Sequence, residues 1–329
     1  MSSRMELALQ SRLRFCLRGQ SLPLLELARE LGVVHLELAD DSDLDTGQVS
    51  EIKRTLDAAG IRVVSMHVPC RFTQCNGSFP PKALDEAKTT IDRANMLGAE
   101  MITFVNHSPP SGTSVADARR SFANGVALLI PEAERRGLRP TFCNLGGLAA
   151  YYGQARYLKQ LCEEFAPQAM FTFDIANWIL AGESVHEALD LLAPWIAIVH
   201  LKDWTIQSRP GSTSSMARNA FRQVTRAVQA SPLRSLARSV GRSLGVGRRL
   251  SADVRGMDGT WYLGAVIGEG ILDHRAILSH LQRASFTGCL SIEYEGSGDP
   301  TEAFRRGTQL IRRILPETVP PACVPETGP

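Results

Sequence analysis

The chain has 329 residues, of which 44% are hydrophobic, and a formal net charge of +2. This length allows two average domains or one large α/β barrel, and the composition is that of a globular protein with enough apolar residues for a core. No stretch is long and apolar enough to span a bilayer, and the N-terminal residues lack a signal-peptide pattern, so we expect a cytoplasmic protein.

Short apolar or β-branched runs alternate with stretches whose apolar residues recur every three or four positions. The runs predict strands near residues 5–9 and at 33–38, 61–68, 99–105, 138–143, 169–173, 196–201 and 289–294. The stretches predict helices at 21–31, 48–59, 82–97, 115–136, 154–165, 184–192, 273–284 and 301–314. Eight strand–helix units, with no Gly-x-Gly-x-x-Gly after the first strand, favour a (β/α)8 TIM barrel over a doubly wound sheet.

We expect residues 1–315 to form a single barrel domain, and the proline-rich residues 316–329 to be a disordered tail. Seven scattered cysteines without a C-x-x-C pair predict reduced thiols rather than a disulfide framework or a zinc ribbon.

A long insertion, at about residues 205–260, follows the seventh strand. Residues 205–252 contain nine arginines and no acidic residue. Six of these arginines recur every four positions in two groups of three, which predicts two basic helix faces: Arg218, Arg222, Arg226, Arg234, Arg238 and Arg242. Two such helices, joined as a hairpin, could cover the barrel mouth as a lid, contact a second copy of the chain or remain a solvated surface. Binding of nucleic acid or of an anionic partner is an alternative that we do not favour.

Polar residues follow seven consecutive predicted strands, where a TIM barrel carries its chemistry. They are Glu37, His67, Asn106, His107, Cys143, Asn144, Asp174, Asn177, His200, Lys202, Asp203, Glu293 and Glu295. Carboxylates and imidazoles from different strands suit one divalent ion such as Mn²⁺, Zn²⁺, Co²⁺ or Mg²⁺. Such an ion could stabilise the enolate that forms when a sugar-like substrate loses a proton next to its carbonyl, with Glu293 or a neighbour as the base. The segment IGEG before a helix is a weak candidate for binding a phosphate.

Four motifs occur in order: FDIANW (173–178), IVHLKDW (198–204), IGEGILDH (267–274) and GCLSIEYEG (288–296). Together they resemble the sugar phosphate isomerase/epimerase family of xylose isomerase-like TIM barrels, over nearly the whole chain apart from the insertion and the tail. The resemblance implies one divalent metal held by four side chains. Asp174, His200 and Glu293 match three of these positions, and Cys143 stands where the family usually has a glutamate.

Cys143 replaces half of the pair of glutamates that the family's epimerases use. It could be a modified fourth ligand, an acid–base group or a packed thiol. Losing a positioned acid–base group costs roughly 10²–10⁴ in rate. Two-base epimerisation is therefore less favoured than a one-base isomerisation or a dehydration of the kind that the family's inosose dehydratases carry out.

The sequence therefore predicts a metal-dependent isomerase, epimerase or dehydratase of a sugar, keto-sugar or polyol, with Glu293 or Glu295 as the proton acceptor. The residues expected to contact the substrate are Glu37, His67, His107, Asn144, Asn177, Lys202 and Arg209. Glu37 could instead orient a metal ligand. A non-catalytic barrel that binds a ligand or partner is the alternative. An endonuclease IV-type nuclease fits less well, because Asn177 replaces a histidine of its D-x-x-H motif and no D-x-H precedes the last strand.

Overall fold

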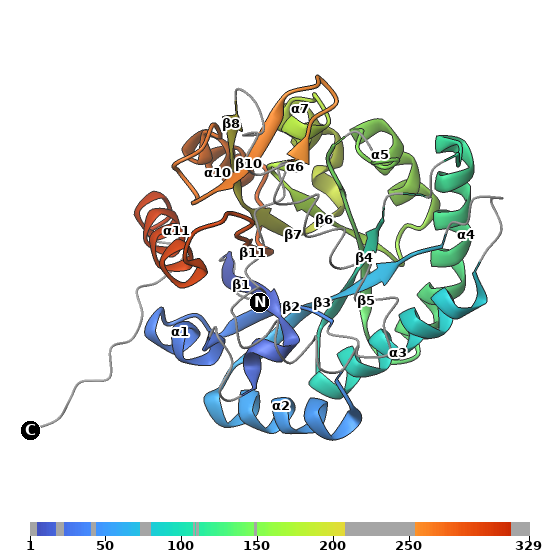
Figure 1. Ribbon diagram of the computed structural model, residues 1–329, viewed down its shortest axis with the longest axis horizontal. Helices are drawn as coiled ribbons and strands as arrows, with labels where there is room; N and C mark the ends of the chain where they lie inside the picture. The colour runs from blue at the N-terminus through green and yellow to red at the C-terminus, as the bar shows by residue number, and fades with distance from the viewer. Residues whose placement is uncertain are drawn as a thin grey trace, which may run out of the picture.

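The computed structural model describes residues 5–17, 23–40, 44–72, 80–107, 109, 112–147, 150–207 and 254–316. Within these residues, eight parallel strands close into a barrel in the order β1-β11-β7-β6-β5-β4-β3-β2 (Figure 1). The strands are β1 (Glu6–Arg12), β2 (His35–Ala39), β3 (Arg62–Cys70), β4 (Met101–Asn106), β5 (Arg139–Cys143), β6 (Met170–Asp174), β7 (Ile196–Leu201) and β11 (Cys289–Ile292). The predicted (β/α)8 barrel is confirmed.

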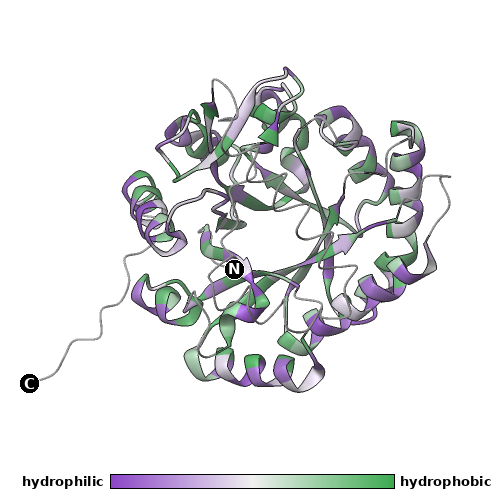
Figure 2. Ribbon diagram, in the orientation of Figure 1, coloured by the Kyte–Doolittle hydropathy of each residue, from purple (hydrophilic) through white to green (hydrophobic). Residues whose placement is uncertain are grey.

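Helices surround the barrel, and their polar residues face outward (Figures 1 and 2). They are α1 (Leu24–Glu30), α2 (Thr46–Ala59), α3 (Pro81–Leu97), α4 (Val115–Glu134), α5 (Ala155–Glu164), α6 (Asn177–Leu180), α7 (Val185–Leu192), α10 (His274–Arg283) and α11 (Pro300–Ile314), with 3-10 turns η1 (Leu13–Cys16) and η2 (Ala193–Trp195). Asp45 caps α2 by accepting from the amide of Gln48. Gly60 and Gly98 end α2 and α3 at φ values of 67° and 68°, a left-handed conformation that glycine adopts without steric cost.

Four buried hydroxyl groups form a hydrogen-bonded layer across the barrel interior, contributed by Ser65, Thr103, Thr141 and Thr172. The Oγ1 atoms of Thr141 and Thr172 lie 2.7 Å apart. Because side chains alternate along a strand, the residue two positions further faces the same interior, one layer nearer the C-terminal end. On β3, β5 and β6 those residues are His67, Cys143 and Asp174.

A second sheet, which the sequence did not predict, follows β7 directly. It contains β8 (Asp203–Gln207), β10 (Trp261–Ala265) and β9 (Val254–Arg255), in the order β8-β10-β9. The amide of Met257 donates to the carbonyl of Leu180, so the β9–β10 turn contacts α6 (Figure 1). β8 and β9 overlap the two ends of the insertion expected at about 205–260, and β10 directly follows it.

Several predictions concern residues outside the described ranges. The arginine stripes at 218–242, Arg209 and the tail at 317–329 lie there, so the lid, the oligomer contact and the domain limits stay predictions. Five of the cysteines are described; all five are buried, and none forms a disulfide within the described residues: Cys16, Cys70, Cys143, Cys162 and Cys289. No helix in the described part of the chain is long and apolar enough to cross a membrane.

Candidate metal centre

Three candidate ligands converge at the C-terminal end of the barrel. Asp174 ends β6, His200 lies in β7, and Glu293 directly follows β11. These three strands are neighbours, and Asp174 pairs with His200 across β6 and β7. One ligand atom from each side chain lies within 4.8 Å of the others, and Asp174 and His200 are buried whereas the Glu293 side chain is 14% exposed. The register of adjacent strands therefore creates a compact set of two carboxylates and one imidazole.

Glu37 holds two histidines in place. Its side chain is fully buried, with Oε1 lying 3.0 Å from Nε2 of His67 and Oε2 lying 2.9 Å from Nε2 of His200. The other ring nitrogen of His200, Nδ1, lies 3.6 Å from Oε2 of Glu293. A histidine that binds a metal through one ring nitrogen usually has a carboxylate or carbonyl beside its other ring nitrogen. Glu37 occupies that second position at His200. This contact supports the interpretation of Glu37 as an orienting group rather than a substrate contact.

The charges of this cluster stabilise one another. Burial alone would raise the pKa of Glu37, but the imidazoles of His200 and His67, which lie 2.9 and 3.0 Å from its carboxylate oxygens, hold that pKa well below its usual range. Burial would lower the pKa of His200, yet the charge of Glu37 raises it well above its usual range. The protonation states of Glu37 and His200 are therefore coupled through their buried 2.9 Å contact.

Cys143 is a buried thiol beside His200. Its Sγ donates to the carbonyl of Asn144 at 3.5 Å, and burial raises the pKa of the thiol above its usual range, against a smaller lowering by the neighbouring imidazole of His200. Among the described residues, the groups of side chains close enough to hold an ion do not include Cys143. The geometry favours a neutral thiol here, and a ligand or acid–base role for Cys143 stays a prediction.

Asn144 and Asn177 position Asp174. The side-chain amide of Asn144 pairs with the backbone of Asp174 in both directions, at 2.9 and 2.8 Å, and so ties β5 to β6. Asn177 Nδ2 donates to Oδ2 of Asp174 at 2.7 Å, while Oδ1 accepts from the backbone amides of Ala176 and Asn177. Both asparagines fix the orientation of a candidate ligand, whereas their contact with a substrate stays a prediction.

Lys202 follows His200 by two residues and lies among three carboxylates. Its Nζ is 2.8 Å from Oδ2 of Asp174, 3.5 Å from Glu293 and 3.6 Å from Glu295. Burial would lower its pKa, but these three charges, with that of Asp174 the largest, raise it well above its usual range. Lys202 is therefore a buried ammonium inside the candidate ligand set, not an exposed contact at the rim.

The IGEGILDH motif is held by Asp203, a structural role that the sequence did not reveal. Asp203 is buried, and its Oδ2 accepts from the amides of Gly268 and Gly270 at 3.0 and 2.9 Å. Its Oδ1 accepts from the amides of Trp204 and Leu272. Because the glycine amides are bound to this carboxylate, the suggestion that IGEG cradles a phosphate is wrong.

His107, which was predicted as a site residue, and Gln10, which was not, both lie outside the ligand set of Asp174, His200 and Glu293. Among the described residues, two groups of side chains could hold an ion: one is Asp174, His200 and Glu293, and the other is Glu37, His67 and His200. His107 follows β4 and lies outside both groups, and its Nε2 is buried without a hydrogen-bond partner among the described residues. Gln10 was missed, although its Nε2 is 3.4 Å from Nε2 of His67 and it pairs with Glu37 across β1 and β2. The sequence could have indicated Gln10, because it is a polar residue directly after Leu9, where we expected the first strand to end.

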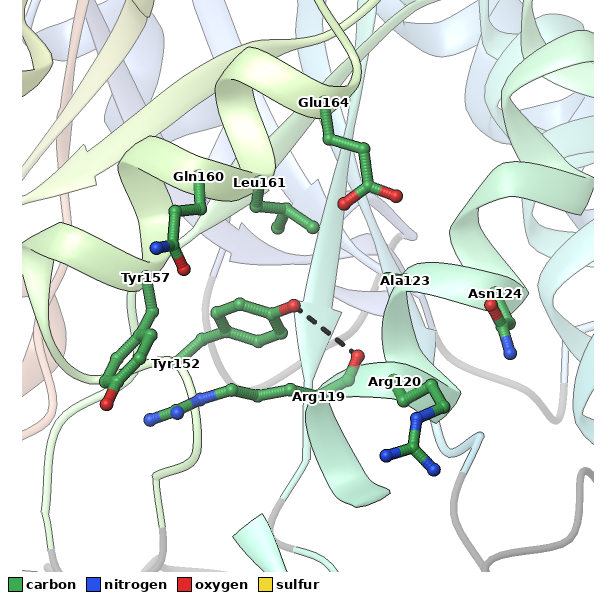
Figure 3. A pocket seen from close by; sticks show the side chains of 9 residues that line it. All are labelled: Arg119, Arg120, Ala123, Asn124, Tyr152, Tyr157, Gln160, Leu161 and Glu164. Atoms are coloured by element: carbon green, nitrogen blue, oxygen red, sulfur yellow. Dashed lines mark hydrogen bonds between the residues drawn. The ribbon is translucent and has the colours of Figure 1, made fainter. Parts of the chain in front are cut away.

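A separate pocket lies outside the barrel between α4 and α5 (Figure 3). In it the guanidinium carbon of Arg119 lies 3.2 Å from the ring centre of Tyr157, and the hydroxyl of Tyr152 donates to the carbonyl of Arg119. None of the predicted site residues lines this pocket. It is therefore distinct from the candidate metal centre.

Solved structures with the same fold match almost the entire chain. A xylose isomerase domain protein from Planctomyces limnophilus is 18% identical, with a TM-score of 0.65 over 96% of this chain and 98% of that one. The IOLI protein, crystallised with a bound zinc atom, is 14% identical, with a TM-score of 0.66 over 95% and 99%. The probable 3-DHS dehydratase AsbF from Bacillus anthracis is 14% identical, with a TM-score of 0.64 over 93% and 98%. At these identities the likeness shows the fold alone.

Other matching structures are described as an epimerase or as epimerase-like. A comparison with curated proteins found no match. The family model described as xylose isomerase-like TIM barrel matches residues 25–314, which include both groups of candidate ligands. This chain belongs to the xylose isomerase-like TIM barrel family.

Proposed function

We propose that this chain is a divalent-metal-dependent enzyme that removes a proton from the carbon next to the carbonyl of a sugar, keto-sugar or polyol-derived substrate. The observation that carries the proposal is the convergence of Asp174, His200 and Glu293 at the C-terminal end of the barrel. These residues would hold the ion, which when bound supplies a positive charge that polarises the substrate carbonyl. Neighbours described as an epimerase, a probable dehydratase and a zinc-bound protein support this class of reaction.

The donor set fits an ion of intermediate hardness. Two carboxylates and one imidazole suit Mn²⁺, Zn²⁺ or Co²⁺ better than an ion that requires oxygen alone. The contact between Glu37 and His200 turns Nδ1 of that histidine toward Glu293. Asn144 and Asn177 hold Asp174 from the other side. These contacts therefore orient His200 and Asp174 before any ion binds.

Glu293 is the proposed base. It is the most exposed of the three candidate ligands, so a substrate in the barrel mouth can reach it. It would accept the proton from the substrate carbon and return it to the neighbouring carbon in an isomerisation, or to a leaving hydroxyl in a dehydration. Glu295, whose side chain is 34% exposed, is the alternative acceptor.

The chemistry of Cys143 favours a one-base reaction. A buried neutral thiol neither removes a proton efficiently nor binds a hard cation well. Two-base epimerisation needs a second acid–base group on the opposite face of the substrate, where this chain has Cys143 in place of the family's glutamate. We therefore rank aldose–ketose isomerisation and dehydration above epimerisation.

Protein purified without chelators and then dialysed against Mn²⁺, Zn²⁺ or Co²⁺ should retain about one ion per chain, measured by elemental mass spectrometry. His200→Ala should lose it, because one of three ligands is removed. Cys143→Ser should retain the wild-type amount, because the thiol is protonated and outside the ligand groups. Loss of metal in Cys143→Ser would instead identify the thiol as a fourth ligand.

The absence of bound metal in the wild-type protein at millimolar ion would contradict the proposal. It would leave the second candidate, a non-catalytic barrel that binds a ligand or partner. That candidate is favoured by one observation, which is that the Lys202 ammonium already neutralises part of the carboxylate cluster. Exchange of a substrate carbon-bound proton with D₂O, followed by NMR over a panel of sugars and keto-sugars, separates the two candidates.

A further inference from the structure

The four hydrogen-bonding sites of the Asp174 carboxylate are all occupied. An ionised carboxylate offers about four lone-pair positions. Oδ1 accepts from the backbone amides of Ala176 and Asn177, and Oδ2 accepts from Asn177 Nδ2 at 2.7 Å and lies 2.8 Å from Lys202 Nζ. Three of these donors belong to the short segment that begins α6 and to the backbone beside it. The fourth is the end of a long side chain, and it is the partner that can move.

The Lys202 ammonium and a divalent ion would share the same carboxylates. Two of the three carboxylates around Nζ, those of Asp174 and Glu293, are two of the three candidate ligands. Oxygen ligands lie roughly 2.0–2.6 Å from such ions, so an ion bound to Oδ2 of Asp174 would lie within a few ångströms of Nζ. In a buried site with low effective dielectric, two positive charges at that separation repel each other strongly.

We propose that the Lys202 ammonium is a built-in competitor for the divalent ion, so that metal binds to Asp174 only when Lys202 withdraws from it. This inference rests on the proposed metal-dependent function and extends it to regulation of the same site. Glu295, which is 3.6 Å from Nζ and more exposed than Asp174 and Glu293, is the carboxylate that remains for the ammonium after it withdraws. The competition makes the affinity of the chain for metal depend on a residue that is not itself a ligand.

The test compares metal affinity in variants that remove or keep the charge. Calorimetric titration with Mn²⁺ and with Zn²⁺ should show that Lys202→Met and Lys202→Gln each bind at least about tenfold more tightly than wild type, since a like charge has been removed. Lys202→Arg, which keeps the charge, should bind no more tightly than wild type. Lys53→Met is the matched control, because Lys53 pairs with Asp57 on the surface of α2 and its loss changes the net charge equally.

A thermal measurement provides a second readout that does not depend on activity. Removing the ammonium leaves Asp174 and Glu293 without their cation, so metal-free Lys202→Met should melt below wild type. Adding Mn²⁺ should then raise its melting temperature by more than that of wild type. Lys202→Gln can replace the hydrogen bond to Asp174, so it keeps the test valid if Lys202→Met does not fold.

The outcomes separate this inference from the proposed function. Unchanged or weaker metal binding in both neutral variants, with metal bound by wild type, would overturn the competition and leave the proposed function intact. Binding by Lys202→Met and Lys202→Gln but not by wild type would support the competition and overturn metal-dependent catalysis in the natural chain. If neither wild type nor the neutral variants bind metal, both proposals fail.

Discussion

Glu293→Gln is expected to lower the rate of substrate C–H exchange by roughly 10²–10⁴, because it removes the proposed proton acceptor while keeping the volume of the side chain. Glu293 directly follows β11 and is 14% exposed, so its carboxylate is both part of the ligand set and open to the barrel mouth. The measurement is proton exchange into D₂O by NMR, made on whichever sugar or keto-sugar of the panel exchanges with wild type.

Glu295→Gln is the matched control for this prediction. Glu295 lies two residues further along, is 34% exposed, and lies at a similar distance from Lys202 Nζ. Its substitution should lower the exchange rate far less than Glu293→Gln. The metal content of both variants must be measured alongside, because a loss of ion would by itself slow exchange. A large loss of rate in Glu295→Gln with a small loss in Glu293→Gln would reverse the two roles.

Asp203→Ala is expected to cost about 3–5 kcal/mol of unfolding free energy, because it removes the shared acceptor of four backbone amides at a buried position. The amides belong to Trp204 and to the segment from Gly268 to Leu272, which leads into α10. Asp203→Asn keeps one side-chain oxygen as an acceptor, so it should lower the unfolding free energy by less than Asp203→Ala does. Urea denaturation monitored by tryptophan fluorescence measures the difference.

Asp258→Ala serves as the comparison for Asp203→Ala. Asp258 also accepts from a backbone amide, that of Thr260, and from the hydroxyl of Tyr262, but it lies in the exposed β9–β10 turn. Water can replace the lost acceptor there, so its substitution should destabilise the protein much less. Equal losses in Asp203→Ala and Asp258→Ala would show that the buried network around Asp203 does not stabilise the fold.

The barrel could be predicted because its signals are local. The spacing of apolar residues distinguishes strands from helices within a few residues, and glycines such as Gly60 and Gly98 mark the ends of helices where they have positive φ. The small sheet β8-β10-β9 was missed because its strands lie at the two ends of the insertion. β9 has only two residues and β10 buries only one of its five, so neither contains the buried apolar run that marks the strands of the barrel.

The candidate site could be predicted only as a set of residues. Side chains alternate along strands, so a polar residue at the C-terminal end of each strand is expected in the same region. Asp174, His200 and Glu293 were predicted in this way and from the motifs, and their ligand atoms do converge. Asn144 and Lys202 were predicted as substrate contacts, and their contacts with Asp174 could not be read from the sequence. A contact of either residue with a substrate stays a prediction.

The sequence by itself determined which residue types reach the mouth of the barrel, because that depends on strand periodicity and on position along each strand. Only the tertiary structure decided which of them touch. Strand register, set by backbone pairing around the closed barrel, places Glu37 of β2 against His200 of β7, which lies three strands away around the barrel. The same closure buries Lys202 among three carboxylates. These contacts join residues far apart in the chain, and no local pattern encodes them.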